Sequence, residues 1–254
     1  MLPRDATLMA NETTGDDRAT FPIVDLPAVD SPGIDASAVA DRVAEVRRRV
    51  DAVGGGRPVR IVAVTKGFGA DAVEAAVAAG VTAIGENYAQ ELVGKADLGA
   101  GRMDVRWHFI GSLQRNKVAP LAPFVAVWQT VDRPAVATAI ARHSPGAVAY
   151  VEVNLTGAVG RGGCSWSDAA QVVGAAREAG LDVQGLMGIG PAGPPDTSRE
   201  AFSALAALAG RLGLAEISAG MSNDYEIAVA EGSTMVRLGT VLFGPRSRQG
   251  DLQR

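Results

Sequence analysis

The chain contains one cysteine, Cys164, and only two histidines, His108 and His143, among its 254 residues. A single thiol cannot form an internal disulfide, which is typical of a protein that works in a reducing compartment. The scattered histidines and the lone cysteine lack the spacing of a zinc site, so we expect no bound metal. These scarcities predict a cytoplasmic protein that needs neither disulfides nor a metal ion.

An excess of positive charge and long hydrophobic runs are also missing. The 24 Lys and Arg residues against 28 Asp and Glu residues give a formal net charge of −4, which argues against nucleic-acid binding. No apolar run approaches the roughly 18 residues that a membrane span needs. The first residues lack a basic region followed by a continuous apolar one, so we expect no secretory signal. We therefore expect neither nucleic acid nor membrane as a partner.

The pattern along the chain predicts one domain behind an extension. Residues 1–33 are rich in Asp, Pro, Thr and Gly without a sustained period, which predicts a poorly ordered segment. Residues 34–53 repeat apolar side chains at helical spacing and are followed by three glycines that end the helix. We expect residues 34–246 to form a single domain and residues 247–254 to form a tail.

Within that domain, eight short apolar segments alternate with alanine-rich helical stretches. The predicted strands are residues 60–66, 81–85, 105–111, 126–131, 147–155, 182–189, 216–220 and 234–240. Eight such alternations without hairpin signals predict a (β/α)₈ TIM barrel preceded by a helix. The alternative is an open doubly wound sheet, since the count alone does not show that the sheet closes.

Lys66 is the residue with the clearest chemical potential, because it directly follows a buried strand. Burying an ammonium group is costly, so packing alone rarely places a lysine there. Desolvation lowers the pKa of a lysine, and the free amine can attack a carbonyl to form an imine. The alternative is a side chain that carries its charge out to solvent. Glu86 and Glu91, further along, are interpreted as surface or supporting carboxylates rather than a catalytic pair.

Two loops after the last strands could bind phosphate. Residues 219–224 close the seventh strand and lead into a helix, and residues 237–240 close the eighth with a glycine and a hydroxyl. Helix starts bind phosphate through free N–H groups, and this fold often uses the loops after strands seven and eight. Arg237 lies in an otherwise apolar strand, so it needs either a ligand atom inside the barrel or a path to solvent.

Six motifs follow one another in a fixed order along the chain. They are residues 63–66 (AVTK), 85–92 (GENYAQEL), 107–117 (WHFIGSLQRNK), 185–189 (GLMGI), 218–224 (SAGMSND) and 232–240 (GSTMVRLGT). Together they resemble the pyridoxal phosphate homeostasis protein family, which is related to the barrel domain of alanine racemase. The family more often has methionine where this chain has Ala219, and commonly has a lysine around Arg161, so we assign no role to Arg161.

The resemblance implies pyridoxal 5′-phosphate as cofactor, held by Lys66 through a covalent Schiff base. Ser222, Gly239 and Thr240 would bind the phosphate, and Arg237 would face the pyridine nitrogen. The remaining contacts implied by the resemblance are Asn87, His108 and Ile110 along the ring and Met221 beside the phosphate.

The same resemblance implies a monomeric, reversible carrier that could supply apo enzymes dependent on pyridoxal phosphate. An arginine opposite the ring nitrogen disfavours its protonation and so weakens the ring as an electron sink. Only 14 residues follow Thr240 (254 − 240), fewer than the domain that completes the alanine racemase site. We expect no catalytic turnover. The alternatives are a pyridoxal-phosphate-dependent amino-acid racemase of low activity and a cofactor-free isomerase that uses Glu86 as a base.

Overall fold

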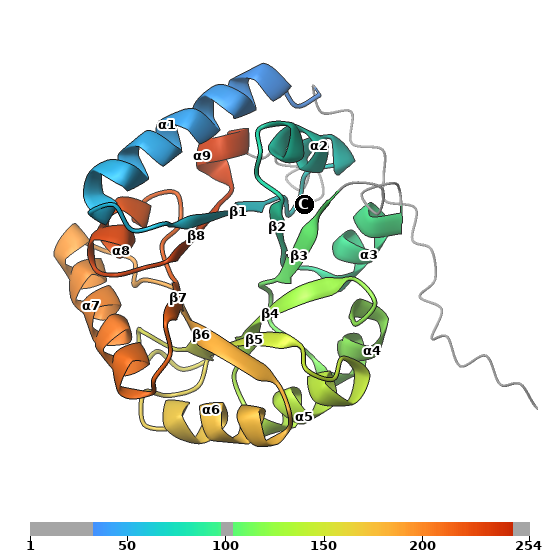
Figure 1. Ribbon diagram of the computed structural model, residues 1–254, viewed down its shortest axis with the longest axis vertical. Helices are drawn as coiled ribbons and strands as arrows, with labels where there is room; N and C mark the ends of the chain where they lie inside the picture. The colour runs from blue at the N-terminus through green and yellow to red at the C-terminus, as the bar shows by residue number, and fades with distance from the viewer. Residues whose placement is uncertain (1–32, 98–103, 246–254) are drawn as a thin grey trace, which may run out of the picture.

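The computed structural model describes residues 33–97 and 104–245. The predicted tail and almost all of the predicted extension lie outside these residues. The described chain forms eight parallel strands, each paired with the next, and β8 pairs with β1 to close the barrel. Figure 1 shows the helices as an outer ring around these strands. The predicted (β/α)₈ barrel is confirmed, and the open doubly wound sheet is wrong.

Strands and helices alternate around the barrel. The strands are β1 (Arg60–Val64), β2 (Ala83–Glu86), β3 (Arg106–Phe109), β4 (Val125–Val131), β5 (Val148–Val153), β6 (Asp182–Gly188), β7 (Glu216–Ser218) and β8 (Met235–Leu238). The helices are α1 (Ala36–Gly54), α2 (Ala70–Ala78), α3 (Ala89–Asp97), η2 (Arg115–Lys117), α4 (Val118–Leu121), α5 (Pro134–His143), α6 (Ala169–Glu178), α7 (Pro195–Arg211), α8 (Tyr225–Ala230) and α9 (Thr240–Phe243). No helix in the described ranges has the length and apolar character of a membrane span.

Side chains alternate between the two faces of each strand and so form two separate hydrophobic clusters. The cluster inside the barrel contains Val62, Val127, Tyr150, Met187 and Met235. The larger cluster fills the space between the strands and the surrounding helices. Because side chains on a strand alternate between its two faces, the positions two and four residues beyond an interior residue also face the barrel axis. The packed interior leaves the carboxyl end of the barrel as the place for a ligand.

Helix α1 covers one side of the barrel before the first strand begins, along α8 and α9 in Figure 1. It buries Val39, Val43, Val46 and Val50, whose spacing places them on one face. Asp35 caps the helix, since its Oδ1 accepts hydrogen bonds from the backbone N–H groups of Ser37 (3.0 Å) and Ala38 (3.1 Å). The helix expected at residues 34–53 is thus confirmed, although it begins two residues later, at Ala36.

Replacing Asp35 with alanine is expected to lower the free energy of unfolding by about 1 kcal/mol, because two N–H groups lose their acceptor. Chemical denaturation would measure the change. The control is Asp41→Ala, which removes an exposed carboxylate from the same helix. Equal stability of the two variants would contradict the capping role.

The predicted eighth strand is too long at its carboxyl end. It was expected to reach Thr240, whereas β8 ends at Leu238 and Thr240 is the first residue of α9. The N–H groups of Leu242 and Phe243 both donate to the carbonyl of Gly239, at 2.9 Å each, and this bonding turns the chain into a helix. The end of β8 is therefore a helix start rather than an extension of the strand.

Candidate functional site at the carboxyl end of the barrel

The residues singled out from the sequence come from separate strands that end at the same face of the barrel. Lys66 follows β1, Asn87 follows β2 and Ile110 follows β3, while Ser222 and Gly239 follow β7 and β8. The carboxyl ends of parallel strands in a barrel share one rim. The fold therefore brings together residues spread over most of the chain.

Lys66 is half-buried, and the backbone on both sides of it is held by hydrogen bonds. The N–H of Thr65 donates to the carbonyl of Gly85 (3.1 Å), and the carbonyl of Thr65 accepts from Lys95 Nζ (2.8 Å). On the other side, the N–H of Gly67 donates to Glu91 Oε2 (2.8 Å). Lys66 thus extends from a backbone fixed on each side.

Lys95, which holds the carbonyl of Thr65, belongs to a buried charge pair. Lys95 Nζ lies 2.5 Å from Glu86 Oε1, with exposed side-chain fractions of 3% and 0%. The hydroxyl of Thr65 donates to the same Glu86 oxygen at 2.6 Å. Burial raises the pKa of Glu86, and the charge of Lys95 opposes that rise. Of the two interpretations offered for Glu86, the surface carboxylate is wrong, because folding of α3 onto β2 buries it against Lys95. The contacts fit the other interpretation, a supporting carboxylate.

The loops after β7 and β8 are joined through Ser222. Its hydroxyl oxygen accepts a hydrogen bond from the N–H of Val241 in α9 (3.2 Å). Gly220 supports this loop with φ of +93°, and a Cβ there would lie 2.7 Å from Ala228 Cβ. Thr240 is exposed, and the first N–H groups of a helix have no acceptor within it. The two loops together offer hydroxyl and N–H groups suited to an anion.

Arg237 is buried inside the barrel, with 4% of its surface exposed. Its Nη1 donates to the carbonyl (2.6 Å) and the hydroxyl oxygen (2.8 Å) of Ser218, and its Nη2 donates to the carbonyl of Gly188 (2.9 Å). Burial lowers the pKa of Arg237 to about 10, so the guanidinium stays protonated at neutral pH. The alternative, a head group in solvent, is wrong.

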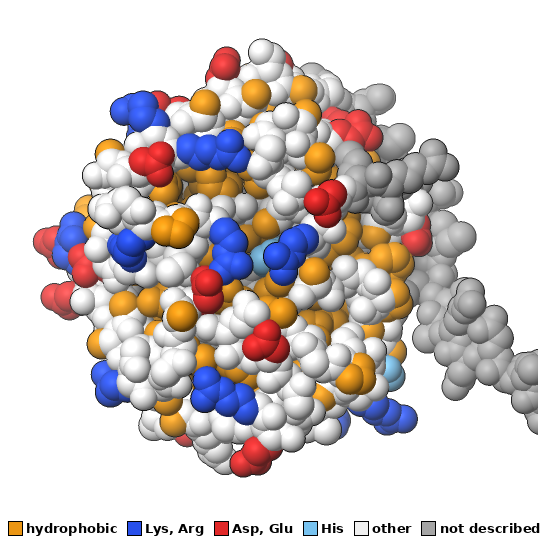
Figure 2. Space-filling model, viewed as in Figure 1, with side chains coloured by type: hydrophobic (Ala, Val, Ile, Leu, Met, Phe, Trp, Pro, Cys, Tyr) orange, Lys and Arg blue, Asp and Glu red, His pale blue; other side chains and the backbone are white. Residues whose placement is uncertain are grey.

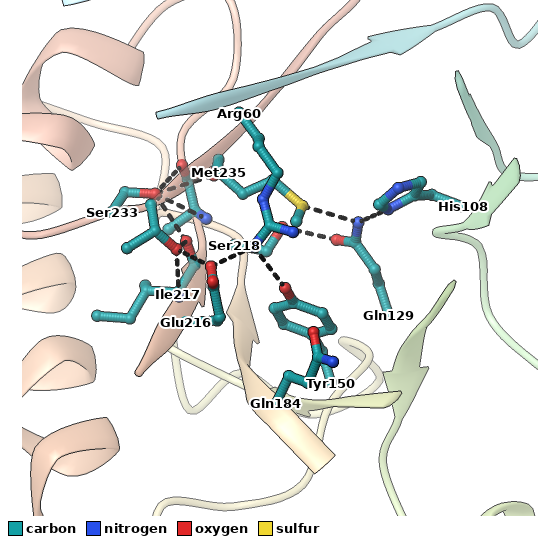
Figure 3. A network of polar contacts seen from close by, with 12 residues as sticks. Arg60, His108, Gln129, Tyr150, Gln184, Glu216, Ile217, Ser218, Ser233 and Met235 are labelled. Atoms are coloured by element: carbon teal, nitrogen blue, oxygen red, sulfur yellow. Dashed lines mark hydrogen bonds and ion pairs between the residues drawn. The ribbon is translucent and has the colours of Figure 1, made fainter. Parts of the chain in front are cut away.

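His108 belongs to the same polar network and is equally buried, with 3% of its surface exposed. The amide nitrogen of Gln129 lies 2.7 Å from His108 Nδ1, and the amide oxygen accepts from the Ser218 hydroxyl at 2.6 Å (Figure 3). Burial lowers the pKa of His108 to about 3, so the ring is neutral and Nδ1 accepts from Gln129. Through Gln129 and Ser218, His108 is connected to Arg237.

The opposite end of the barrel interior is also polar. Arg60, the first residue of β1, forms an ion pair with Glu216 at the start of β7 and lies 3.5 Å from the hydroxyl of Tyr150 (Figure 3). In the view down the barrel, Figure 2 shows basic side chains, a histidine and an acidic side chain near the centre of the visible face. The starts of β1 and β7 are thus linked by an ion pair.

Asn87 and Ile110 line the part of the rim that follows β2 and β3. Asn87 Oδ1 is buried, and no residue that the structure describes hydrogen-bonds to it. Ile110 Cδ1 lies 3.1 Å from where a Cβ on Gly85 would be, so Ile110 covers the inward face of β2. Met221, by contrast, is 38% exposed. The rim therefore combines an apolar wall with an acceptor that is available to a ligand.

Three buried polar residues were not predicted from the sequence: Lys95, Gln129 and Glu152. The Glu152 side chain is 7% exposed and lies on β5, facing the barrel interior. Burial raises its pKa to about 7, against the opposing charge of Arg237. The available signals were weak: Lys95 lies four residues after Glu91 on one helix, and Gln129 and Glu152 interrupt apolar strands.

A closed parallel barrel with a lysine after β1, a buried arginine in β8 and paired loops after β7 and β8 defines the alanine-racemase type of barrel. The chain belongs to the family described as alanine racemase, N-terminal domain, whose model matches residues 34–247, and within it to the pyridoxal phosphate homeostasis proteins. The relative from Pseudomonas aeruginosa is 37% identical over 83% of this chain and 96% of its own. The one from Deinococcus radiodurans is 39% identical over 73% and 88%.

Solved structures agree with this assignment. PipY of Synechococcus elongatus, solved without PLP, is 30% identical with a TM-score of 0.74, covering 81% of this chain and all of PipY. PipY solved with PLP bound is 29% identical with a TM-score of 0.72 over the same shares. Alanine racemase from Corynebacterium glutamicum, at 20% identity and a TM-score of 0.65, covers 86% of this chain and 64% of the racemase and shares the fold. The family expected from the sequence motifs is confirmed.

Proposed function

We propose that this protein binds pyridoxal 5′-phosphate through Lys66 and acts in cofactor homeostasis as a reversible carrier. The observation that carries the proposal is a half-buried lysine at the rim of a barrel that also contains the buried Arg237. The relatives named for pyridoxal phosphate homeostasis, and PipY solved with PLP bound, support the choice of ligand.

The described residues fit such a ligand. Asn87 Oδ1 is a buried acceptor that no described group satisfies, and a polar group of a ligand at the rim would satisfy it. Gly239 would place a Cβ 3.3 Å from the carbonyl oxygen of Val64, so glycine lets this loop lie against the end of β1. The phosphate loop thereby comes close to the strand that carries Lys66.

Each residue then has a defined task. The cofactor would supply an aldehyde and an electron-poor ring, and the Lys66 amine would bond to the aldehyde carbon. We assign the phosphate to Ser222, Gly239 and Thr240 with Met221 beside it, and the ring to Asn87, His108 and Ile110. Arg237, protonated and fixed by three hydrogen bonds, would face the ring nitrogen and oppose its protonation. A neutral ring withdraws electrons weakly, which favours storage over turnover.

Transfer to a recipient enzyme tests this proposal. We expect the loaded protein, freed of excess cofactor, to reactivate an apo enzyme that depends on pyridoxal phosphate. Reactivation should persist when an added phosphatase destroys free cofactor, because bound phosphate is shielded. Loaded protein should leave the optical rotation of L-alanine unchanged. Failure to reactivate, or steady loss of rotation, would contradict the carrier and favour the racemase.

We further propose that the protein acts as a cytoplasmic monomer. A single cysteine suits a reducing compartment. Light scattering on the loaded protein should give a mass near 26.0 kDa.

A further inference from the structure

Glu152 is an unusual residue in the interior of the barrel. On β5 it is two residues from Tyr150, a member of the interior cluster, so alternation turns Glu152 toward the barrel axis. With 7% of the residue exposed, Glu152 has no side-chain hydrogen bond or ion pair among the residues that the structure describes, and its oxygens are not among the fully enclosed side-chain atoms that lack a partner. A largely buried carboxylate without a direct counter-ion is still costly, so its presence calls for an explanation beyond its contacts within the chain.

The surroundings of Glu152 are closed on the side of the β5–α6 loop. A Cβ on Gly162 would lie 3.0 Å from Glu152 Oε1, so that loop passes directly against the carboxylate. Arg237, on β8, is near enough to act on Glu152 electrostatically, but its guanidinium already donates to Ser218 and Gly188. The carboxylate therefore faces the interior beside Arg237 without being neutralised by a direct ion pair.

We propose that Glu152 is a specificity-determining residue of the cofactor site, whose charge sets how tightly the site holds an anionic pyridine phosphate. This inference rests on the proposed function. A neutral Glu152 leaves the positive charge of Arg237 fully available to an anion. An ionised Glu152 offsets that charge and repels the phosphate.

The protonation state of Glu152 changes close to neutral pH. Burial raises its pKa to about 7; among the charged groups, Arg237 on β8 opposes the rise and Asp132, after β4, adds to it. Below this pKa the carboxyl is neutral, and above it the group is ionised. Binding of an anionic ligand should therefore weaken as the pH rises through about 7.

The test compares wild type with Glu152→Gln, which keeps the shape and removes the charge. The probe is pyridoxine 5′-phosphate, which has no aldehyde and so cannot bond to Lys66. Between about pH 6 and about pH 8.5, we expect the wild-type Kd to rise about tenfold more than that of Glu152→Gln. Ionisation of the probe affects the Kd of both proteins equally, so it cancels when the two pH dependences are compared. Asp132→Asn, the control, should keep most of the wild-type pH dependence.

If the Kd values of wild type and Glu152→Gln changed in parallel with pH, the role of Glu152 would be overturned but the proposed function would not. Absence of binding by both proteins at every pH would overturn the proposed function as well. A second measurement does not require the variant to bind the probe. Carboxyl ¹³C NMR would give the pKa of Glu152 in the wild-type protein, and Glu152→Gln would serve to assign the signal. Saturation with the probe should raise the Glu152 pKa, because protonation and anion binding are linked. An unchanged pKa would contradict the proposal.

Discussion

Replacing Lys95 with methionine is expected to lower the free energy of unfolding by about 3–5 kcal/mol, enough to endanger folding. Methionine fills the space of the lysine stem but leaves Glu86, fully buried, without its counter-ion. The carbonyl of Thr65 also loses its partner, so the turn that carries Lys66 loosens. Urea denaturation would measure the loss of stability, and cofactor titration of the folded fraction would measure the weaker binding.

The control for this variant is the double change Lys95→Met with Glu86→Gln. Removing both charges avoids an uncompensated buried ion, so part of the stability should return. A single Lys95→Met variant as stable as wild type would show that Glu86 does not depend on Lys95.

Replacing Lys66 with arginine is expected to abolish covalent capture of pyridoxal phosphate completely while the fold persists. Arginine keeps the positive charge, but its guanidinium does not bond to an aldehyde as an amine does. Lys66 is half-buried at a strand end, so the longer side chain can reach solvent. Mass spectrometry after borohydride reduction should find the cofactor on Lys66 of wild type and on no lysine of the variant. A cofactor fixed to another lysine of either protein would refute the assignment.

The barrel was predictable because its evidence is local. Each strand is a short apolar segment and each helix follows at once, so order along the chain already specifies eight parallel strands. Lys66 and Arg237 were also recognisable, since each is a charged residue next to or inside an apolar strand. The β8 boundary was not, because the turn at Gly239 depends on hydrogen bonds from α9 that the strand pattern does not contain.

Lys95 and Gln129, which support the site, could not be predicted either, and the reason is a different one. Lys95 looks like any solvent-facing lysine on a helix until α3 packs against β2 and buries it beside Glu86. Gln129 bonds to a residue 21 positions before it and another 89 positions after it. Such contacts exist only once the sheet closes, so they cannot be predicted from the spacing of residues along the sequence.

The pairing of β1 with β8 has a consequence for biosynthesis. Lys66 is translated well before Ser222, Gly239 and α9. Phe68 meets Phe243 only across the junction of β1 with β8, with ring centroids 5.4 Å apart. In the proposed site, a growing chain would therefore have the Lys66 amine long before it has the residues assigned to the phosphate. Under the proposed function, stable retention of the cofactor would begin only after β8 and α9 are translated, so it would report a closed barrel.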